Sequence, residues 1–166
     1  MFKRVNANID LPSVESEISS YWDKINAFET SVENRKNDKT FRFYDGPPFP
    51  TGSPHYGNLL AGVIKDIVPR YWTMRGYYVE RRFGWDVHGL PIEMEVQKKL
   101  NLEDPQQIDE YGIDKFNEAC RSQVQTNTEN WEKITRKIGR WVDFENDYKT
   151  MDIEFMESVW WVFKEL

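Results

Sequence analysis

The sequence predicts an α/β protein in which parallel strands alternate with helices, and two observations carry this prediction. An aromatic, β-prone run at 41–45 leads into a proline- and glycine-rich loop and then into helix-patterned sequence at 57–75. After Gly76 a second strand-like run, 77–83, begins. The order strand, helix, strand is typical of a parallel sheet. The length of 166 residues and the hydrophobic content of 39% suit one packed core.

Ahead of this unit, residues 1–40 are expected to form an N-terminal helix and a linker. Apolar side chains recur at helical spacing through 13–29, and Ser13 is a suitable N-cap. Residues 30–40 are polar and charged, which predicts the linker. The remaining residues, 41–166, are then expected to form the domain that holds the sheet.

The helix predicted at 57–75 has apolar residues at helical spacing, including Leu60, Ile64 and Ile67. Pro69 should kink or restart this helix, because proline cannot donate the backbone hydrogen bond that a helix interior needs. Gly76 should end it as a C-terminal cap.

Beyond the second strand the chain is predicted to be mainly helical. Pro91 suits the first turn of a helix at 91–100, and further helices are expected at 113–138 and from 152 to the end. Asp104-Pro105 and residues 141–148 are expected to interrupt them. Two strands are too few for a stable parallel sheet. The last helix is still apolar at Leu166, so we expect the sequence to be part of a longer protein.

The functional prediction centres on the loops that follow the two strands. Ligands bind open α/β sheets at the carboxyl ends of strands, and the chain's two histidines, His55 and His88, lie one in each loop. His55 and Asn58 fall in the first turn of a predicted helix, whose unpaired N–H groups and dipole suit a phosphate. Gly57 would let a flat base approach the backbone. Asp86 in the second loop could pair with a ligand ammonium.

Structural roles for the same residues remain open at this point. Asn58 could simply cap its helix, and Asp86 could form an Asx-turn or a cap. His88 could be a hydrogen-bonded structural histidine. Trp85 is expected to be a packing residue.

Composition excludes several classes of protein. The single cysteine, Cys120, rules out an internal disulfide and a cysteine-cluster zinc site, and we expect it to be a packing residue. No metal site is predicted, because the histidines and carboxylates lack ligand spacing. The net charge of −6 gives no general attraction to nucleic acid. No apolar run has membrane length, and the N-terminus has no apolar signal core, so a cytoplasmic protein is expected.

Two motifs resemble the class I aminoacyl-tRNA synthetases. Residues 48–58, Pro-Phe-Pro-Thr-Gly-Ser-Pro-His-Tyr-Gly-Asn, resemble the first signature of that family, usually written HIGH. Asn58 stands where the signature has histidine, and asparagine keeps an N–H donor there. Within the family, residues 84–93, Gly-Trp-Asp-Val-His-Gly-Leu-Pro-Ile-Glu, are similar to the isoleucyl enzymes, as are 44–48 and 111–117. The leucyl enzymes have an aromatic residue in place of His88, and the valyl enzymes differ more.

The resemblance implies the first half of a Rossmann-type catalytic domain. It implies activation of isoleucine with ATP to isoleucyl-adenylate, with Mg²⁺ arriving on the nucleotide, and then transfer to the isoleucine tRNA. The residues that it assigns to ATP, with His55 and Asn58 catalytic, are Pro48, Phe49, His55, Gly57 and Asn58. The residues that it assigns to the amino acid, with Asp86 pairing with the ammonium, are Gly46, Pro47, Asp86 and His88.

A lysine-rich second signature of the KMSKS type is absent from the sequence. We therefore expect an N-terminal part of such an enzyme, cut before the editing insertion and inactive or only weakly binding on its own. The alternatives are a truncated synthetase-like binding module without catalysis, and a leucyl or valyl enzyme.

Overall fold

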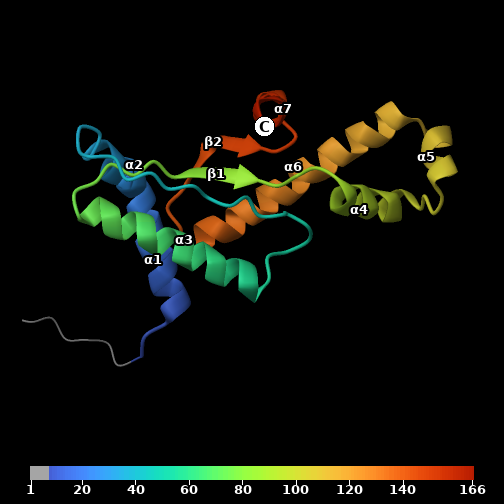
Figure 1. The fold of residues 1–166 in the computed structure, drawn as a ribbon. Coiled ribbons are helices and arrows are strands. Elements are labelled where there is room, and N and C mark those ends of the chain that lie inside the picture. Colours follow the sequence, from blue (N-terminus) through green and yellow to red (C-terminus); the bar gives the residue numbers. More distant parts are fainter. Residues whose placement is uncertain (1–7) are drawn as a thin grey trace, which may run out of the picture.

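The structure, a computed structural model, describes residues 8–166 and is of mixed α/β class, as predicted. Figure 1 shows two short strands at the centre, with α3 and α6 on one side and α7 on the other. Within the described range, the elements are α1 Leu11–Lys24, α2 Ala27–Glu33, α3 Tyr56–Met74, β1 Arg82–Trp85, α4 Leu90–Leu100, α5 Pro105–Tyr111, α6 Ile113–Lys137, β2 Asp143–Lys149 and α7 Ile153–Glu165. Residues 1–7 of the predicted N-terminal segment lie outside this range.

The two strands form a parallel sheet, but they are not the two strands that the sequence predicted. β1 pairs with β2 through Arg82↔Asp143, Gly84↔Tyr148 and Trp85↔Lys149, with an irregularity between the first two pairs. β1 thus begins near the end of the predicted strand 77–83. β2 overlaps the stretch 141–148, which was predicted only as a break between helices. Its sequence, Asp-Phe-Glu-Asn-Asp-Tyr-Lys, has low β-propensity, so pairing with β1 decides its conformation.

The strand predicted at 41–45 is wrong as a regular strand. The chain makes one parallel bridge there, Thr40↔Tyr78, with Phe41 N–H donating to the Tyr78 carbonyl at 2.9 Å. Beyond it, residues 41–45 form no strand ladder in the part of the chain that the structure describes. Aromatic β-propensity alone does not make a strand when no neighbour pairs with it.

The predicted helix 13–29 is two helices. Asn26 adopts a left-handed conformation, φ 46°, which ends α1 and starts α2. Asp10, and not Ser13, is the N-cap of α1, and Pro12 lies in its first turn. Because α2 continues to Glu33, the predicted linker 30–40 is shorter than expected.

α3 matches its prediction closely, and Gly76 follows its end with φ 89° as expected of a helix-terminating glycine. Pro69, however, does not restart the helix, which runs through it without interruption. The Pro69 carbonyl accepts from the hydroxyl of Thr73 at 2.9 Å and from Arg81 Nη2 at 3.3 Å.

α4, α6 and α7 lie where helices were predicted, and α5 is an addition. Asp104 caps α5 by accepting from Gln106 N–H at 2.9 Å, and Gln107 Oε1 accepts from the Asp104 N–H. A capping box followed by proline in the first turn is a known sequence pattern for the start of a helix. The sequence therefore contained a signal for α5 at Asp104-Pro105, where only an interruption was predicted.

The core lies between the sheet and the helices that follow it. β1 contributes Phe83 and Trp85, which pack on Phe144 of β2 and on the inner faces of α4 and α6. α4 and α5 pack along α6 and form an arm that extends away from the sheet (Figure 1). In residues 8–166, no helix has both the length and the apolar character that a membrane crossing requires.

Candidate functional site

The N-terminus of α3 is built by the two residues that the first loop was predicted to contribute. His55 is the N-cap, and its Nδ1 accepts from Gly57 N–H at 3.1 Å. Asn58 Oδ1 accepts in turn from His55 N–H at 3.0 Å. Asn58 therefore does help to cap the helix, as the structural alternative proposed. The cap uses only the acceptor atoms Asn58 Oδ1 and His55 Nδ1.

The cap uses none of the donor atoms of these two side chains. A neutral imidazole that accepts at Nδ1 carries its proton on Nε2, and the Asn58 amide keeps its Nδ2 hydrogens. Among residues 8–166 neither donor has a hydrogen-bond partner, and His55 is exposed. The cap thus orients one ring N–H and one amide N–H at the positive end of a helix dipole, which suits a phosphate.

Gly57 has a structural reason to be glycine. A Cβ at this position would lie 3.0 Å from His55 Cε1 and 3.1 Å from Nδ1, closer than ordinary van der Waals contact. The missing side chain therefore makes room for the imidazole ring that caps the helix.

The first and second loops are joined directly. Asp86 N–H donates to the Pro48 carbonyl at 3.0 Å, so both loops meet beside the sheet. Thr150, which follows β2, accepts from Val87 N–H at 3.0 Å, and its hydroxyl lies 3.4 Å from Asp86 Oδ1. These contacts fix the second loop and, within residues 8–166, leave the half-buried Asp86 carboxylate with one weak neutral partner.

The remaining predicted residues lie in the same two loops. Gly46 is exposed, while Pro47, Pro48 and Phe49 are half-buried. His88 is exposed, and within the described part of the chain its ring makes no hydrogen bond. The described residues therefore offer no hydrogen-bond partner that would support a structural role for His88.

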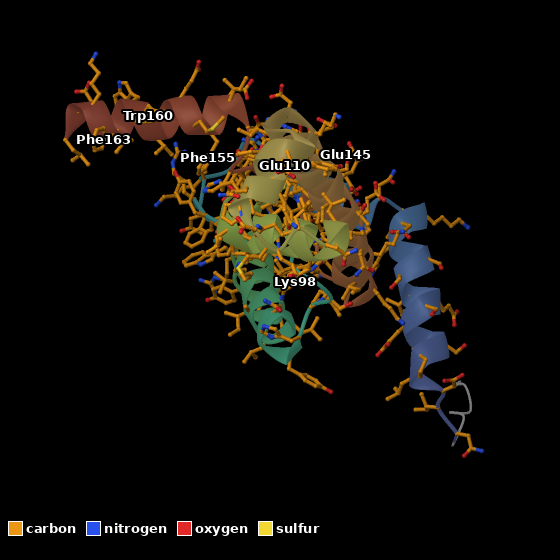
Figure 2. All side chains as sticks on the ribbon, turned by 90° about the vertical axis from the view of Figure 1, so that its right-hand side faces the viewer. Lys98, Glu110, Glu145, Phe155, Trp160 and Phe163 are labelled. Carbon is orange, nitrogen blue, oxygen red and sulfur yellow. The ribbon has the colours of Figure 1, made fainter. Side chains whose placement is uncertain are left out.

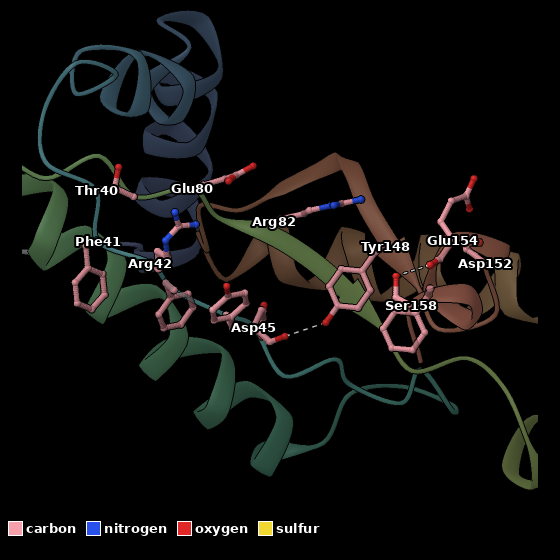
Figure 3. Close-up of a pocket in the computed structure, with 13 residues that line it drawn as sticks. Thr40, Phe41, Arg42, Asp45, Glu80, Arg82, Tyr148, Asp152, Glu154 and Ser158 are labelled. Carbon is pink, nitrogen blue, oxygen red and sulfur yellow. Dashed lines mark hydrogen bonds between the residues drawn. The ribbon is translucent and has the colours of Figure 1, made fainter. Parts of the chain in front are cut away.

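Sequence reasoning missed a charged cluster directly beside the first loop, formed by Asp45, Lys65, Arg140 and Tyr148 and called here the Asp45 cluster. The Asp45 side chain is 2% exposed and lies between Lys65 Nζ, 2.6 Å from Oδ1, and Arg140, which donates to Oδ2. Lys65 Nζ also donates to the Gly46 carbonyl at 2.6 Å. The Tyr148 hydroxyl donates to the Asp45 carbonyl at 3.1 Å, as the dashed line in Figure 3 shows.

Two cavities flank this cluster. A narrow one of about 50 Å³ lies between the first loop, α3 and α6, where Trp131 Nε1 donates to the Gly52 carbonyl at 2.8 Å. A larger one of about 660 Å³ lies along residues 40–45, beside β1 and α7 (Figure 3). The larger cavity includes none of the predicted site residues, so the donors at α3, and not cavity size, locate the candidate site.

No metal centre is apparent in the described part. Within residues 8–166 there is no group of three or more histidine, cysteine, aspartate or glutamate side chains placed to hold an ion. Cys120 is half-buried against the core, and burial raises the pKa of its thiol.

The chain is similar to known proteins over almost its whole length. The family described as "tRNA synthetases class I (I, L, M and V)" matches residues 17–166. Isoleucine–tRNA ligase, cytoplasmic, of Arabidopsis thaliana is 56% identical over 155 residues, which are 93% of this chain and 13% of that protein. Isoleucine–tRNA ligase of Treponema denticola is 51% identical over 166 residues, 100% of this chain and 15% of that protein. The cytoplasmic isoleucine–tRNA ligase of Saccharomyces cerevisiae is 53% identical over 161 residues, which are 97% of this chain and 15% of that protein.

The chain thus spans only 13% to 15% of the length of these relatives. Among solved structures, the LeuRS–tRNA–LeuAMS ternary complex of Agrobacterium radiobacter K84 is similar, with a TM-score of 0.68 and 19% identity. That match covers 96% of this chain and 18% of the LeuRS chain. At this identity the likeness concerns the fold, which is consistent with part of a Rossmann-type domain.

Proposed function

The chain belongs to the class I tRNA synthetases (I, L, M and V), and from this premise we propose that it supplies the ATP- and amino-acid-binding half of an isoleucyl-adenylate-forming site. The observation that carries the proposal is the capped N-terminus of α3, where His55 and Asn58 keep their donor atoms for a ligand. The bond from Asp86 N–H to Pro48 sets the second loop beside it. The names of the relatives support isoleucine as the amino acid.

The proposed reaction suits these residues because it needs no protein nucleophile. The carboxylate of isoleucine attacks the α-phosphorus of ATP and pyrophosphate leaves. Catalysis then consists of positioning and of stabilising charge on phosphate oxygens, which N–H donors do well. Mg²⁺ would enter with ATP as part of the substrate.

The roles of the individual residues are part of the proposal. His55 and Asn58 donate to the phosphates, and Asp86 pairs with the ammonium of isoleucine. Further contacts to ATP would come from Pro48, Phe49 and Gly57, and further contacts to the amino acid from Gly46, Pro47 and His88.

In the whole protein we propose a second step, transfer of isoleucine to the isoleucine tRNA, in the cytoplasm. Residues 41–166 would be half of the catalytic domain, preceded by the helices of residues 1–40. Because the lysine-rich signature is absent from these 166 residues, the chain alone is not expected to catalyse activation.

The test is amino-acid-dependent ATP–pyrophosphate exchange by the full product of the reading frame that encodes the chain. We expect exchange with isoleucine to exceed exchange with leucine, valine and methionine. Preference for leucine or valine would overturn the assignment of the amino acid. The 166-residue chain alone serves as a comparison, and strong exchange by it would contradict the proposal that half a site is insufficient.

A further inference from the structure

The Asp45 cluster lies between the two loops and the helix that carries His55, and none of its members contacts a substrate in the roles proposed above. We propose that Asp45 is a positioning residue for amino acid activation: with Lys65 and Arg140 it holds the backbone of Gly46 and Pro47 in the conformation that binds the amino acid. This inference rests on the proposed function and adds to it the device that orders the amino acid side of the site.

Lys65 links this backbone to α3. Its ammonium lies 2.6 Å from Asp45 Oδ1 and also donates to the Gly46 carbonyl at 2.6 Å. The donation fixes the direction of the Gly46 carbonyl, and therefore the plane of the peptide that joins Gly46 to Pro47. Because Lys65 is on the helix whose first turn holds His55, one helix orients both the phosphate donors and the amino acid loop.

Arg140 and Tyr148 hold Asp45 from the opposite side. Arg140 donates to Asp45 Oδ2 and lies over the Phe83 ring, 5.1 Å from its centroid. The Tyr148 hydroxyl donates to the Asp45 carbonyl, and its ring lies on bare backbone at Gly84, where a Cβ would be 2.2 Å from the ring. Asp45 is therefore tied to α3, to the residues after α6 and to the paired strands.

Stability alone is a weak reason for such a cluster. Burying charged groups is costly, and replacing buried ion pairs with apolar residues is often neutral or stabilising. The pairing is also incomplete: in residues 8–166, neither Asp45 Oδ1 nor Arg140 Nε has an aligned hydrogen-bond partner, although Oδ1 has Lys65 as an ion-pair neighbour. The cluster instead fixes the backbone conformation at Gly46, the first residue of the first loop.

The test uses the full-length protein and measures KM for isoleucine and for ATP separately in the exchange assay. Asp45→Asn keeps the shape of the side chain and removes its charge, and Lys65→Met removes the donor to Gly46. We expect each variant to raise KM for isoleucine by about tenfold or more, since small misplacements of positioning groups have large effects. KM for ATP should stay within about twofold, because the α3 cap is untouched.

Glu132→Gln is the matched control, because it breaks the exposed ion pair with Arg136, 2.8 Å, which contacts neither loop. Lys65→Met leaves the Arg140–Asp45 contact in place, so it serves if Asp45→Asn does not fold. Unchanged KM for isoleucine, or equal changes in both KM values, would overturn the positioning role. A wild-type protein without isoleucine-dependent exchange would instead overturn the proposed function, and this inference with it.

Discussion

At the scale of single residues, His55 combines two tasks in different atoms. Its Nδ1 caps α3, whereas its Nε2 has no hydrogen-bond partner in residues 8–166. A serine can take over the first task, because serine is among the preferred N-cap residues, but not the second.

The variant His55→Ser in the full-length protein separates these tasks. We expect its thermal midpoint to stay close to that of the wild type, while the rate of isoleucine-dependent exchange falls by about 10²–10³-fold, as for loss of one transition-state donor. His55→Ala, which removes both tasks, is the comparison. Exchange by His55→Ser near the wild-type rate would mean that the histidine only caps its helix.

Tyr148 gives the protein a predicted dependence on alkaline pH. Burial, with a further contribution from the nearby Asp45 carboxylate, raises the pKa of the Tyr148 hydroxyl above its ordinary value of about 10. Between the ordinary pKa and this raised one, the unfolded chain binds fewer protons than the folded chain, so stability falls as pH rises.

Tyr148→Phe cannot ionise, so its free energy of unfolding should fall less than that of the wild type as pH rises from about 9 to 11. Urea unfolding at a series of pH values measures the difference. Parallel curves for the two proteins would show that Tyr148 does not contribute to this dependence.

Residue identity could single out part of the candidate site but not the rest. His55, Asn58 and Asp86 could be singled out because each follows a strand-like run in a distinctive local pattern. The Asp45 cluster could not, since Arg140 is 95 residues away along the chain from Asp45. Only the fold brings these charges together.

At the scale of elements, helices were more predictable than strands. α3 and α6 have apolar residues at helical spacing over many turns, which fixes their type. β2 has only one buried residue, Phe144, so its strand conformation depends on β1 and not on its own pattern. The boundary between α1 and α2 at Asn26 was not predicted, because one asparagine in an apolar helical pattern gives no strong signal for the end of a helix.

The conformation of Asn26 predicts how the N-terminal helices respond to substitution. Its φ of 46° is left-handed, where a Cβ costs roughly 1–2 kcal/mol and glycine is free of that cost. We expect Asn26→Ala to destabilise the protein by about 1 kcal/mol relative to Asn26→Gly. Urea unfolding of both variants makes the comparison, and equal stability would contradict a left-handed Asn26.

At the scale of the whole molecule, α7 and α3 are among the helices that present apolar surface to solvent. Figure 2 shows α7 extending from the body with Trp160 and Phe163 along it, and these side chains are 69% and 71% exposed. α3 exposes a second apolar stripe that contains Leu60, Ile64 and Ile67. Soluble monomers rarely expose contiguous apolar patches of this kind.

The 166-residue chain on its own is therefore expected to self-associate. Sedimentation velocity over a range of concentrations should show species larger than the monomer, and Trp160→Lys with Phe163→Lys should reduce them. Glu157→Lys, on the same helix, is the control for added charge. A monodisperse monomer at high concentration would contradict this expectation.

Joined by the bond from Asp86 N–H to the Pro48 carbonyl, the two loops are proposed to form one site for an aminoacyl-adenylate. The most direct measurement is a crystal structure of the full-length protein with a non-hydrolysable isoleucyl-adenylate analogue. We expect the phosphate mimic to accept hydrogen bonds from His55 Nε2 and Asn58 Nδ2, and the ammonium to pair with the Asp86 carboxylate. An analogue bound without contact to either loop would contradict it.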